Sequence, residues 1–302
     1  MSGTASPSTE TPYGLARVCR VWGIPRSTVY WQRTRGGGDA TGRPGPEGAG
    51  SDHDLLAAIR RVIETGPFFG EGYRTIWARL RMEGICTAMR RVRRLMREHD
   101  LSAPNRPPRR PEKTHDKTIT TERVDTTWGT DMTETVLTTG QKVRIFAAVD
   151  HCNSECVGIH AAVRGTRWEA LEPVRQAVGR FFGPVASGVA KGLTLRHDHG
   201  SNDMARDFQR EIAFLGIESS PSFVREPEGN GVAERFFRTL KEQLLWVRTF
   251  DTVEELLAAL RAFKDHYNAN WLLQRHGGRT PDQVRDKQAA KPLAETAMPV
   301  AA

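Results

Sequence analysis

Residues 128–149 read WGTDMTETVLTTGQKVRIFAAV and contain the pattern that decides the fold. Trp128–Leu137 and Val143–Val149 are rich in β-branched and aromatic side chains, and Gly140-Gln141 between them favours a turn. The segment therefore predicts two strands joined as a hairpin, with a buried run in the second strand. Asp131 lies inside the first strand, where an acidic side chain is costly unless something compensates its charge.

Downstream of this hairpin, the spacing of apolar residues alternates between the periods of strands and of helices. We expect strands at 155–161, 193–196 and 217–219, and helices at 167–182, 204–215 and 232–246. This order is typical of a mixed α/β sheet covered by helices. Together with an amphipathic helix at 253–267, it predicts one body over residues 120–285 and a disordered tail over residues 286–302.

Upstream of the body, the chain has the composition of two small helical modules and two linkers. The segment GLARVCRVWGIPRSTVYWQR has the shape of a helix-turn-helix, in which Arg26 and Thr28 of the second helix would face DNA. A helical hairpin without a role in DNA binding is the alternative. The predicted order is a partial helix-turn-helix at 1–35, a flexible linker at 36–51, a basic helical DNA-binding module at 52–103 and a basic Pro/Arg linker at 104–119.

The positive charge of the chain is concentrated in the second helical module. The net charge is +8, and the stretch from Arg74 to Lys113 holds twelve Lys/Arg against four Asp/Glu, so the rest of the chain is formally neutral. A basic module beside a neutral body indicates a grip on nucleic acid, and a solvated arginine face is the alternative. The arginines that would contact phosphates share one helix face: Arg90, Arg91, Arg93, Arg94 and Arg97.

Composition also excludes several classes of protein. No apolar run approaches the roughly 18 residues of a membrane span, and the polar first residues lack the apolar core of a signal peptide. The four cysteines have neither the spacing nor the histidine partners of a zinc site, so we expect reduced thiols. These observations predict a cytoplasmic protein without membrane contact.

Two further acidic residues stand where they could converge with Asp131. Asp198 follows the strand at 193–196, and the carboxyl ends of strands commonly form sites in α/β sheets. Glu234 lies in the first turn of a helix, and 35 residues separate it from Asp198. Carboxylate oxygens suit Mg²⁺ or Mn²⁺, and two such ions roughly 3.5 to 4 Å apart promote in-line displacement at phosphorus. We therefore expect Asp131 to bridge two ions; a solvated carboxylate or a helix cap is the alternative for any one residue alone.

Three motifs connect these carboxylates to a known family. They are Trp128-x-x-Asp131-Met132-Thr133, His197-Asp198-His199-Gly200-Ser201-Asn202 and Gly229-Asn230-Gly231-x-x-Glu234-Arg235-Phe236-Phe237-x-x-Leu240-Lys241. With GYRTIWARLRMEGI and RRVRRLMREHDL upstream, the chain from about Asp54 to Val284 resembles the second-reading-frame (OrfB-type) transposases of bacterial insertion sequences of the IS-three family. Those are relatives of retroviral integrases. The resemblance implies a ribonuclease-H-like α/β core preceded by small all-α DNA-binding modules.

The resemblance also implies roles for single residues. Asp131, Asp198 and Glu234 correspond to the family's catalytic, metal-binding acidic triad, and Lys241 corresponds to a basic residue that contacts DNA near the scissile end. From their positions beside the triad, His197, His199 and Asn230 would support it, and the alternative for His197 and His199, which flank Asp198, is to bind the metal or a phosphate. One departure concerns Asn202-Asp203, which stands where many relatives carry a Gln-Tyr pair.

The predicted function is transposition, that is, DNA cleavage and strand transfer at terminal inverted repeats and into target DNA, with Mg²⁺ or Mn²⁺. Strand transfer must hold two DNA ends together, so we expect a homo-oligomer. The resemblance adds an upstream-frame helix-turn-helix protein, or a fusion with it, as a partner, and a bacterial cytoplasm as the location, at the nucleoid. A metal-dependent nuclease of the same fold and a domesticated DNA-binding protein are the alternatives.

Overall fold

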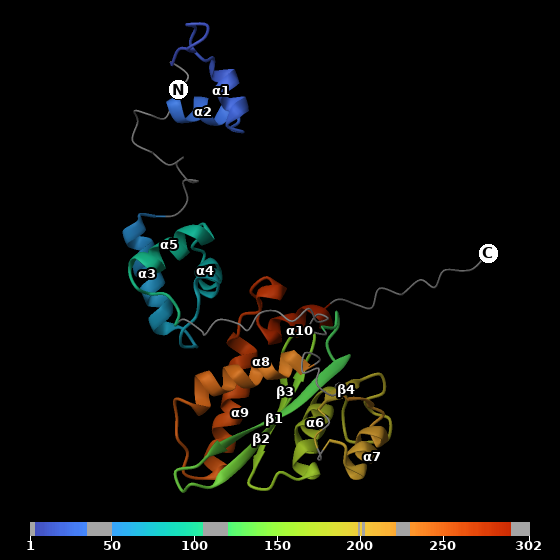
Figure 1. The fold of residues 1–302 in the computed structure, drawn as a ribbon. Helices are drawn as coiled ribbons and strands as arrows, with labels where there is room; N and C mark the ends of the chain where they lie inside the picture. The colour runs from blue at the N-terminus through green and yellow to red at the C-terminus, as the bar shows by residue number, and fades with distance from the viewer. Residues whose placement is uncertain are drawn as a thin grey trace, which may run out of the picture. The chain divides into compact units, whose positions relative to one another are not determined.

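The computed structural model of the 302-residue chain describes residues 4–34, 50–104, 120–198, 200, 203–221 and 230–290 (Figure 1). The chain divides into two units, residues 1–51 and 52–302. The two expected linkers, 36–51 and 104–119, lie outside the described residues except for residues 50, 51 and 104. Within the described ranges, no helix is long and apolar enough to cross a membrane.

The first unit is a pair of short helices joined by a tight turn. Its helices are α1 (Leu15–Val21) and α2 (Arg26–Thr34). Gly23 in the turn has φ +64°, a left-handed conformation that glycine adopts without strain. The Ile24 N–H donates across this turn to the carbonyl of buried Cys19, at 3.0 Å. The helix-turn-helix shape expected from the sequence is therefore present, although the second helix begins one residue before Ser27.

The helical module contains α3 (Asp52–Thr65), α4 (Tyr73–Met82) and α5 (Met89–Glu98). Each helix is amphipathic and turns one apolar face towards the other two. Their shared core includes the fully buried side chains Ile59, Ile76 and Val92. The arginines of α5 lie on the opposite face, as the sequence pattern predicts.

The body (residues 120–290) is built on a five-stranded mixed sheet with the spatial order β3-β2-β1-β4-β5. The strands are β1 (Thr127–Val136), β2 (Lys142–Asp150), β3 (Cys156–Ala162), β4 (Thr194–His197) and β5 (Glu218–Pro221). β1, β2 and β3 pair antiparallel, whereas β4 and β5 run parallel to β1. The crossover helices are α6 (Arg167–Phe181) and α7 (Arg206–Phe214). The order of strands and helices predicted from the sequence is confirmed.

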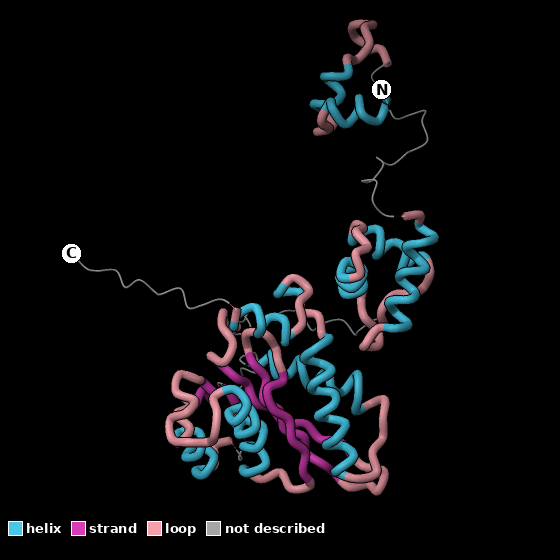
Figure 2. The backbone as a smooth tube through the Cα atoms, turned by 180° about the vertical axis from the view of Figure 1, so that it is seen from behind, coloured by secondary structure: helices cyan, strands magenta, loops and turns pink. Residues whose placement is uncertain are grey.

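Helices cover both faces of this sheet (Figure 2). The first two α-helices after β5 are α8 (Gly231–Leu240) and α9 (Val253–Asn270). They pack on the face that carries Ile145, whereas α6 and α7 pack on the face that carries Trp128. Because neighbouring residues of a strand point to opposite faces, β2 contributes Ile145 to one core and Phe146 to the other.

The C-terminal part closes on the sheet through η3 (Gln274–His276), a 3-10 helix, and α10 (Pro281–Ala289). Thr280 caps α10 in a capping box. The helix continues beyond residue 285, because the Gln288 side chain accepts a hydrogen bond from the Val124 N–H at 2.9 Å. The expected disordered tail is therefore wrong for residues 286–289, and residues 291–302 lie outside the described part.

The helical module is held against the body by a buried aromatic side chain and by hydrogen bonds. Phe68, in the loop between α3 and α4, belongs to the core beneath α9 and meets Trp271 edge-on at 5.0 Å. The Phe69 N–H donates to the Gln243 side chain at 2.9 Å, and the Gln243 amide donates back to the Phe69 carbonyl at 3.0 Å. The module and the body thus form one compact unit.

Candidate active site

Asp131 and Asp198 lie on neighbouring strands. β1 pairs with β4 in parallel, and Gly129 stands opposite Arg196. Continuing this register by two residues places Asp131 of β1 level with Asp198, the residue that follows β4. Side chains two residues apart point to the same face of a sheet. Both carboxylates therefore lie on the face of Gly129, which is the face covered by α8.

A hydrogen bond fixes the start of α8 against β1. Asn230 precedes α8, is 1% exposed, and donates from its side-chain amide to the Thr130 carbonyl at 2.7 Å. Gly129 allows this close approach, because a Cβ there would lie 2.5 Å from Asn230 Oδ1 and 2.6 Å from His151 Nε2. Glu234 follows Asn230 by about one helical turn, so this contact brings it to the strand that carries the first carboxylate.

The pKa of Asp131 shows that the three carboxylates share one electrostatic environment. Burial is the main cause that raises this pKa, to about 6, and the charges of Asp198 and Glu234 add to it. The Met132 N–H, which donates to Asp131 Oδ1 at 2.7 Å, and the charge of Lys241 act in the opposite direction. The structure thus brings Asp131, Asp198, Glu234 and Lys241 into one neighbourhood.

Lys241 lies where α8 ends and the helix widens into η2 (Lys241–Leu245), a π-helical turn. The sequence predicts one regular helix up to residue 246, whereas the structure has a π-helical turn after residue 240. Such turns are frequent at functional sites, because they change the direction of the side chains that follow. Lys241 itself is half-buried, and its charge reaches the Asp131 carboxylate.

His197 holds the backbone that carries Asp198. Its buried ring has Nδ1 at 2.9 Å from the Asp198 carbonyl oxygen and Nε2 at 2.9 Å from Ser219 Oγ. Because a carbonyl can only accept, Nδ1 donates to the Asp198 carbonyl, and Nε2 shares a hydrogen bond with the Ser219 hydroxyl. Both ring nitrogens therefore face protein groups, which fits a supporting residue and not a metal ligand. His199 lies outside the described residues.

The donor set suits a hard divalent cation. Asp131, Asp198 and Glu234 offer carboxylate oxygens, the ligands that Mg²⁺ and Mn²⁺ prefer. Their mutual repulsion, which contributes to the raised pKa of Asp131, is what a bound cation would relieve. In the described part of the chain, no three His, Cys, Asp or Glu side chains are gathered tightly enough to hold an ion as they stand. The triad is therefore a set of electrostatic neighbours, not a closed coordination shell.

Comparison with known proteins identifies the family. Over 254 residues the chain is 30% identical to the InsD transposase of insertion element IS2A/D/F/H/I/K from Escherichia coli, and the match covers 81% of this chain and 82% of that protein. The chain belongs to the IS-three (IS3) family of transposases. The InsD transposase of insertion element IS2-9 from Escherichia coli K12 is also 30% identical, over 81% of this chain and 80% of its own length.

Two domain families match parts of this transposase. An HTH-like domain matches residues 51–110, and an integrase core domain matches residues 215–281. Among solved structures, the simian T-cell lymphotropic virus intasome in complex with PP2A regulatory subunit B56 gamma has a TM-score of 0.48 at 19% identity, over 81% of this chain and 80% of that chain. The catalytic core domain of BIV integrase has a TM-score of 0.40 at 24% identity, over 55% and 97%. The family and the mixed sheet confirm the ribonuclease-H-like fold class.

The arginines expected to contact DNA differ in their surroundings. Arg91 and Arg94 of α5 pair with Asp52 at the start of α3, both at 2.6 Å, so they tie two helices of the module together. Arg93 lies over the Tyr73 ring, 5.4 Å from its centroid. Arg90 and Arg97 of α5 and Arg26 of α2 are exposed, and the structure gives none of them an ion pair with a described residue. Thr28 of α2 is exposed as well.

The transposase has a fourth carboxylate beside the triad, which the sequence reasoning missed. Burial, and then the charges of Asp198 and Asp131, raise the pKa of Asp203 to about 7. Its backbone carbonyl accepts from the Gln209 amide at 2.7 Å, which ties this residue to α7. In the sequence, Asp203 stands only as an acidic residue after Asn202, and no local pattern places it beside the triad. This environment favours the protonated form of the Asp203 carboxyl more than water does.

Proposed function

We propose that this chain catalyses metal-dependent DNA cleavage and strand transfer at the terminal inverted repeats of an insertion element. The observation that carries the proposal is the electrostatic meeting of Asp131, Asp198 and Glu234 from three separate elements, beside Lys241. Membership of a transposase family supplies the class of reaction. Attack by water at a repeat end frees a 3′-hydroxyl, which then attacks a target phosphodiester, joins its 5′-phosphate and releases a target 3′-hydroxyl.

The metal of this proposal is Mg²⁺ or Mn²⁺, as two ions held by Asp131, Asp198 and Glu234. Such a pair supplies activation of the attacking oxygen and stabilisation of the leaving oxygen. The chain itself contributes placement. β1 and the end of β4 hold two carboxylates side by side, and α8 adds the third. Lys241 offers a positive charge to a phosphate near the scissile bond.

The helical modules supply DNA recognition in this proposal. The HTH-like match includes α5, which exposes Arg90 and Arg97, and α2 of the first unit exposes Arg26 and Thr28. Phosphate contacts fix the register on a duplex, and a few side chains in a groove read bases. Because two DNA ends must meet, the working form is a homo-oligomer at the bacterial nucleoid, and an upstream-frame helix-turn-helix protein or fusion would complete the short first unit.

The test compares triad variants on a labelled repeat end in Mg²⁺. Asp131→Ala, Asp198→Ala and Glu234→Ala should each lower cleavage and joining by at least about 100-fold, because each removes charge that holds the ions. Binding of the repeats, measured by gel shift, should stay unchanged. A matched control is Asp265→Ala, which removes an exposed carboxylate on α9 that pairs with neighbouring Lys264 and should leave all three measurements unchanged.

A second measurement does not depend on activity. Mg²⁺ should raise the thermal unfolding temperature of the wild type more than that of Asp131→Asn, because only the intact folded site binds the ion tightly. Strand transfer retained by Asp198→Ala would overturn the catalytic assignment. DNA that is cut but never joined by the wild type would identify a nuclease of the same fold.

A further inference from the structure

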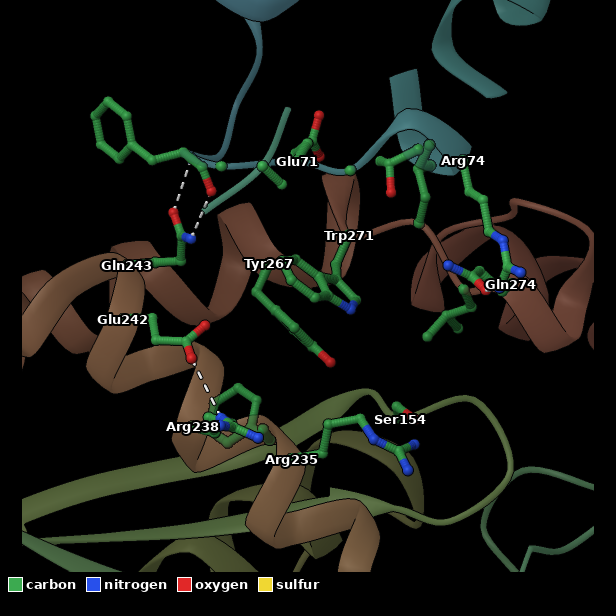
Figure 3. A pocket seen from close by; sticks show the side chains of 18 of the residues that line it. Glu71, Arg74, Ser154, Arg235, Arg238, Glu242, Gln243, Tyr267, Trp271 and Gln274 are labelled. Carbon is green, nitrogen blue, oxygen red and sulfur yellow. Dashed lines mark hydrogen bonds and ion pairs between the residues drawn. The ribbon is translucent and has the colours of Figure 1, made fainter. Parts of the chain in front are cut away.

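An open cleft of about 1210 Å³ lies between the helical module and the body (Figure 3). One wall comes from the loop before α4, with Glu71, and from the first turn of α4, with Arg74. The other wall comes from α8, η2 and the end of α9. The acidic triad does not line it. Its volume exceeds the roughly 300 to 1,000 Å³ of small-molecule sites, which favours a larger occupant.

The charges that line this cleft favour an anion. Glu71 is bound by Arg79 through two hydrogen bonds, at 2.6 and 2.5 Å, so its charge is compensated from outside the cleft. Glu242 pairs with Arg238 at 3.2 Å. Arg235 is exposed on the body side and has no ion pair with any residue that the structure describes, and Arg74 faces it from the module. Once the internal pairs are taken into account, the walls present positive charge.

The cleft also exposes aromatic rings at a cost in free energy. Phe69 is 79% exposed and Trp246 is 70% exposed, and both lie on its rim. Deeper in, Trp271 stacks on Tyr267 with ring centroids 5.5 Å apart, and Figure 3 shows these two rings at the centre of the cleft. Aromatic faces interleaved with arginines are the surface that proteins use for unpaired nucleotides, because rings stack on bases while guanidinium groups bind phosphates.

The surface of α8 connects this cleft to the acidic site. Glu234 and Arg235 are neighbours in the chain, so they point about 100° apart around the helix axis. Arg238, one turn after Glu234, points between these two directions and lines the cleft. A DNA strand that leaves the triad on this side therefore meets Arg238 first and Arg235 next.

We propose that this cleft binds an unpaired DNA strand adjacent to the scissile phosphate, with bases stacked on Trp246 and Phe69 and phosphates bound by Arg235 and Arg74. The proposal rests on the proposed function for the origin of that strand. A segment of a second copy is the other class of occupant. The surplus of arginine charge and the continuity with the acidic site favour nucleic acid.

The test measures binding of a fluorescent thymidine oligonucleotide, about 12 nucleotides long, to the full chain without divalent metal, so that no cleavage occurs. Trp246→Ala should weaken binding about tenfold, because it removes one stacking platform. Arg235→Ala should lower the slope of log affinity against log salt by about 0.7, the value for one phosphate of a single strand. Arg74→Ala, on the opposite wall, should have the same effect as Arg235→Ala.

Matched controls remove the same groups elsewhere on the body. Trp168→Ala removes a ring that is 52% exposed on α6, and Arg261→Ala removes an exposed arginine on α9; neither residue lines the cleft. Both controls should bind the oligonucleotide like the wild type. Photo-crosslinking with a bromodeoxyuridine oligonucleotide should label the peptide that contains Trp246.

Three results would overturn the proposal. Cleft variants that bind as tightly as the controls, or crosslinks found only outside the cleft, would exclude a strand there. A Trp246→Ala variant that binds the oligonucleotide normally but loses self-association would assign the cleft to a second copy. If the cleft does not bind a DNA strand, the wild type should still cleave repeat ends. If the proposed function is wrong, the triad variants should not differ from the wild type in cleavage. The two failures are therefore distinguishable.

Discussion

Gly129→Ala is the substitution that most directly tests how the body assembles its acidic site. A methyl group at this position would lie 2.5 Å from Asn230 Oδ1 and 2.6 Å from His151 Nε2, closer than carbon atoms approach these groups. The Asn230 side chain must therefore move, and its 2.7 Å hydrogen bond to the Thr130 carbonyl is lost or stretched. The start of α8 then shifts away from β1 and takes Glu234 with it.

The magnitude follows from two contributions. A buried carbonyl left without its donor costs about 1 to 3 kcal/mol. Overpacking by one methyl group costs about 1 to 3 kcal/mol. Because the movement that breaks the hydrogen bond also relieves part of the overpacking, we expect a total loss of roughly 2 to 4 kcal/mol in the free energy of unfolding. For a body of this size, that loss corresponds to a decrease of roughly 5 to 15 °C in the unfolding temperature. A displacement of Glu234 by about 1 Å should lower cleavage about 100-fold in the molecules that stay folded.

The assay combines thermal unfolding by circular dichroism with cleavage of a labelled repeat end at a temperature well below both transitions. The matched control is Gly179→Ala on the exposed face of α6, where an added Cβ meets nothing within 4 Å. Alanine in that helix should stabilise the protein by about 0.5 to 1 kcal/mol and leave cleavage unchanged. A Gly129→Ala protein with wild-type unfolding and wild-type cleavage would refute the reasoning that links this glycine to the site.

Three further predictions concern the body and the module. Burial raises the pKa of Asp150 from its ordinary value of 3.8 to about 6, so its stabilising contribution is present below about pH 4 and is lost as the pH rises through about 6. Asp150→Asn should flatten this part of the stability profile in urea unfolding, and an unchanged profile would show that Asp150 does not cause it. Arg285→Met should lower the free energy of unfolding by about 3 to 5 kcal/mol, because fully buried Glu155 loses its partner at 2.5 Å. A loss below about 1 kcal/mol in chemical denaturation would contradict this. Arg90→Ala with Arg97→Ala should reduce the salt slope of repeat binding by about two, and an unchanged slope in gel shifts would place both arginines outside the interface.

The sequence was a sufficient guide to the order of elements, because that order depends on local periodicity. The alternation of apolar and polar residues in β1 and β2 and the helical spacing of apolar residues in α6 to α9 can each be read within one continuous segment. The type of each element therefore follows from nearby residues alone. Boundaries were less accurate where a distant partner decides them. α10 continues to Ala289 because Gln288 bonds to Val124, more than 160 residues earlier in the chain.

The residues of the candidate site also differ in how clearly a local sequence pattern marks them. Asp131 is marked in the sequence by an acidic residue inside a strand, and Asp198 and Glu234 by their positions at element ends and by motifs shared with a family. Asp203 carries almost no local signal. Its raised pKa arises from burial and from the charges of Asp198 and Asp131, which only the folded chain brings near it.

The sequence by itself determined the class of fold and the family, and it predicted the acidic triad, because residue types and their spacing along the chain carry that information. The tertiary structure decided how these residues are held and what surrounds them. The approach of Asn230 to Gly129, the π turn at Lys241 and the cleft between module and body all depend on contacts between segments about 100 or more residues apart or on packing at a helix end. Such contacts are set by the free energy of the whole fold, which no local pattern records.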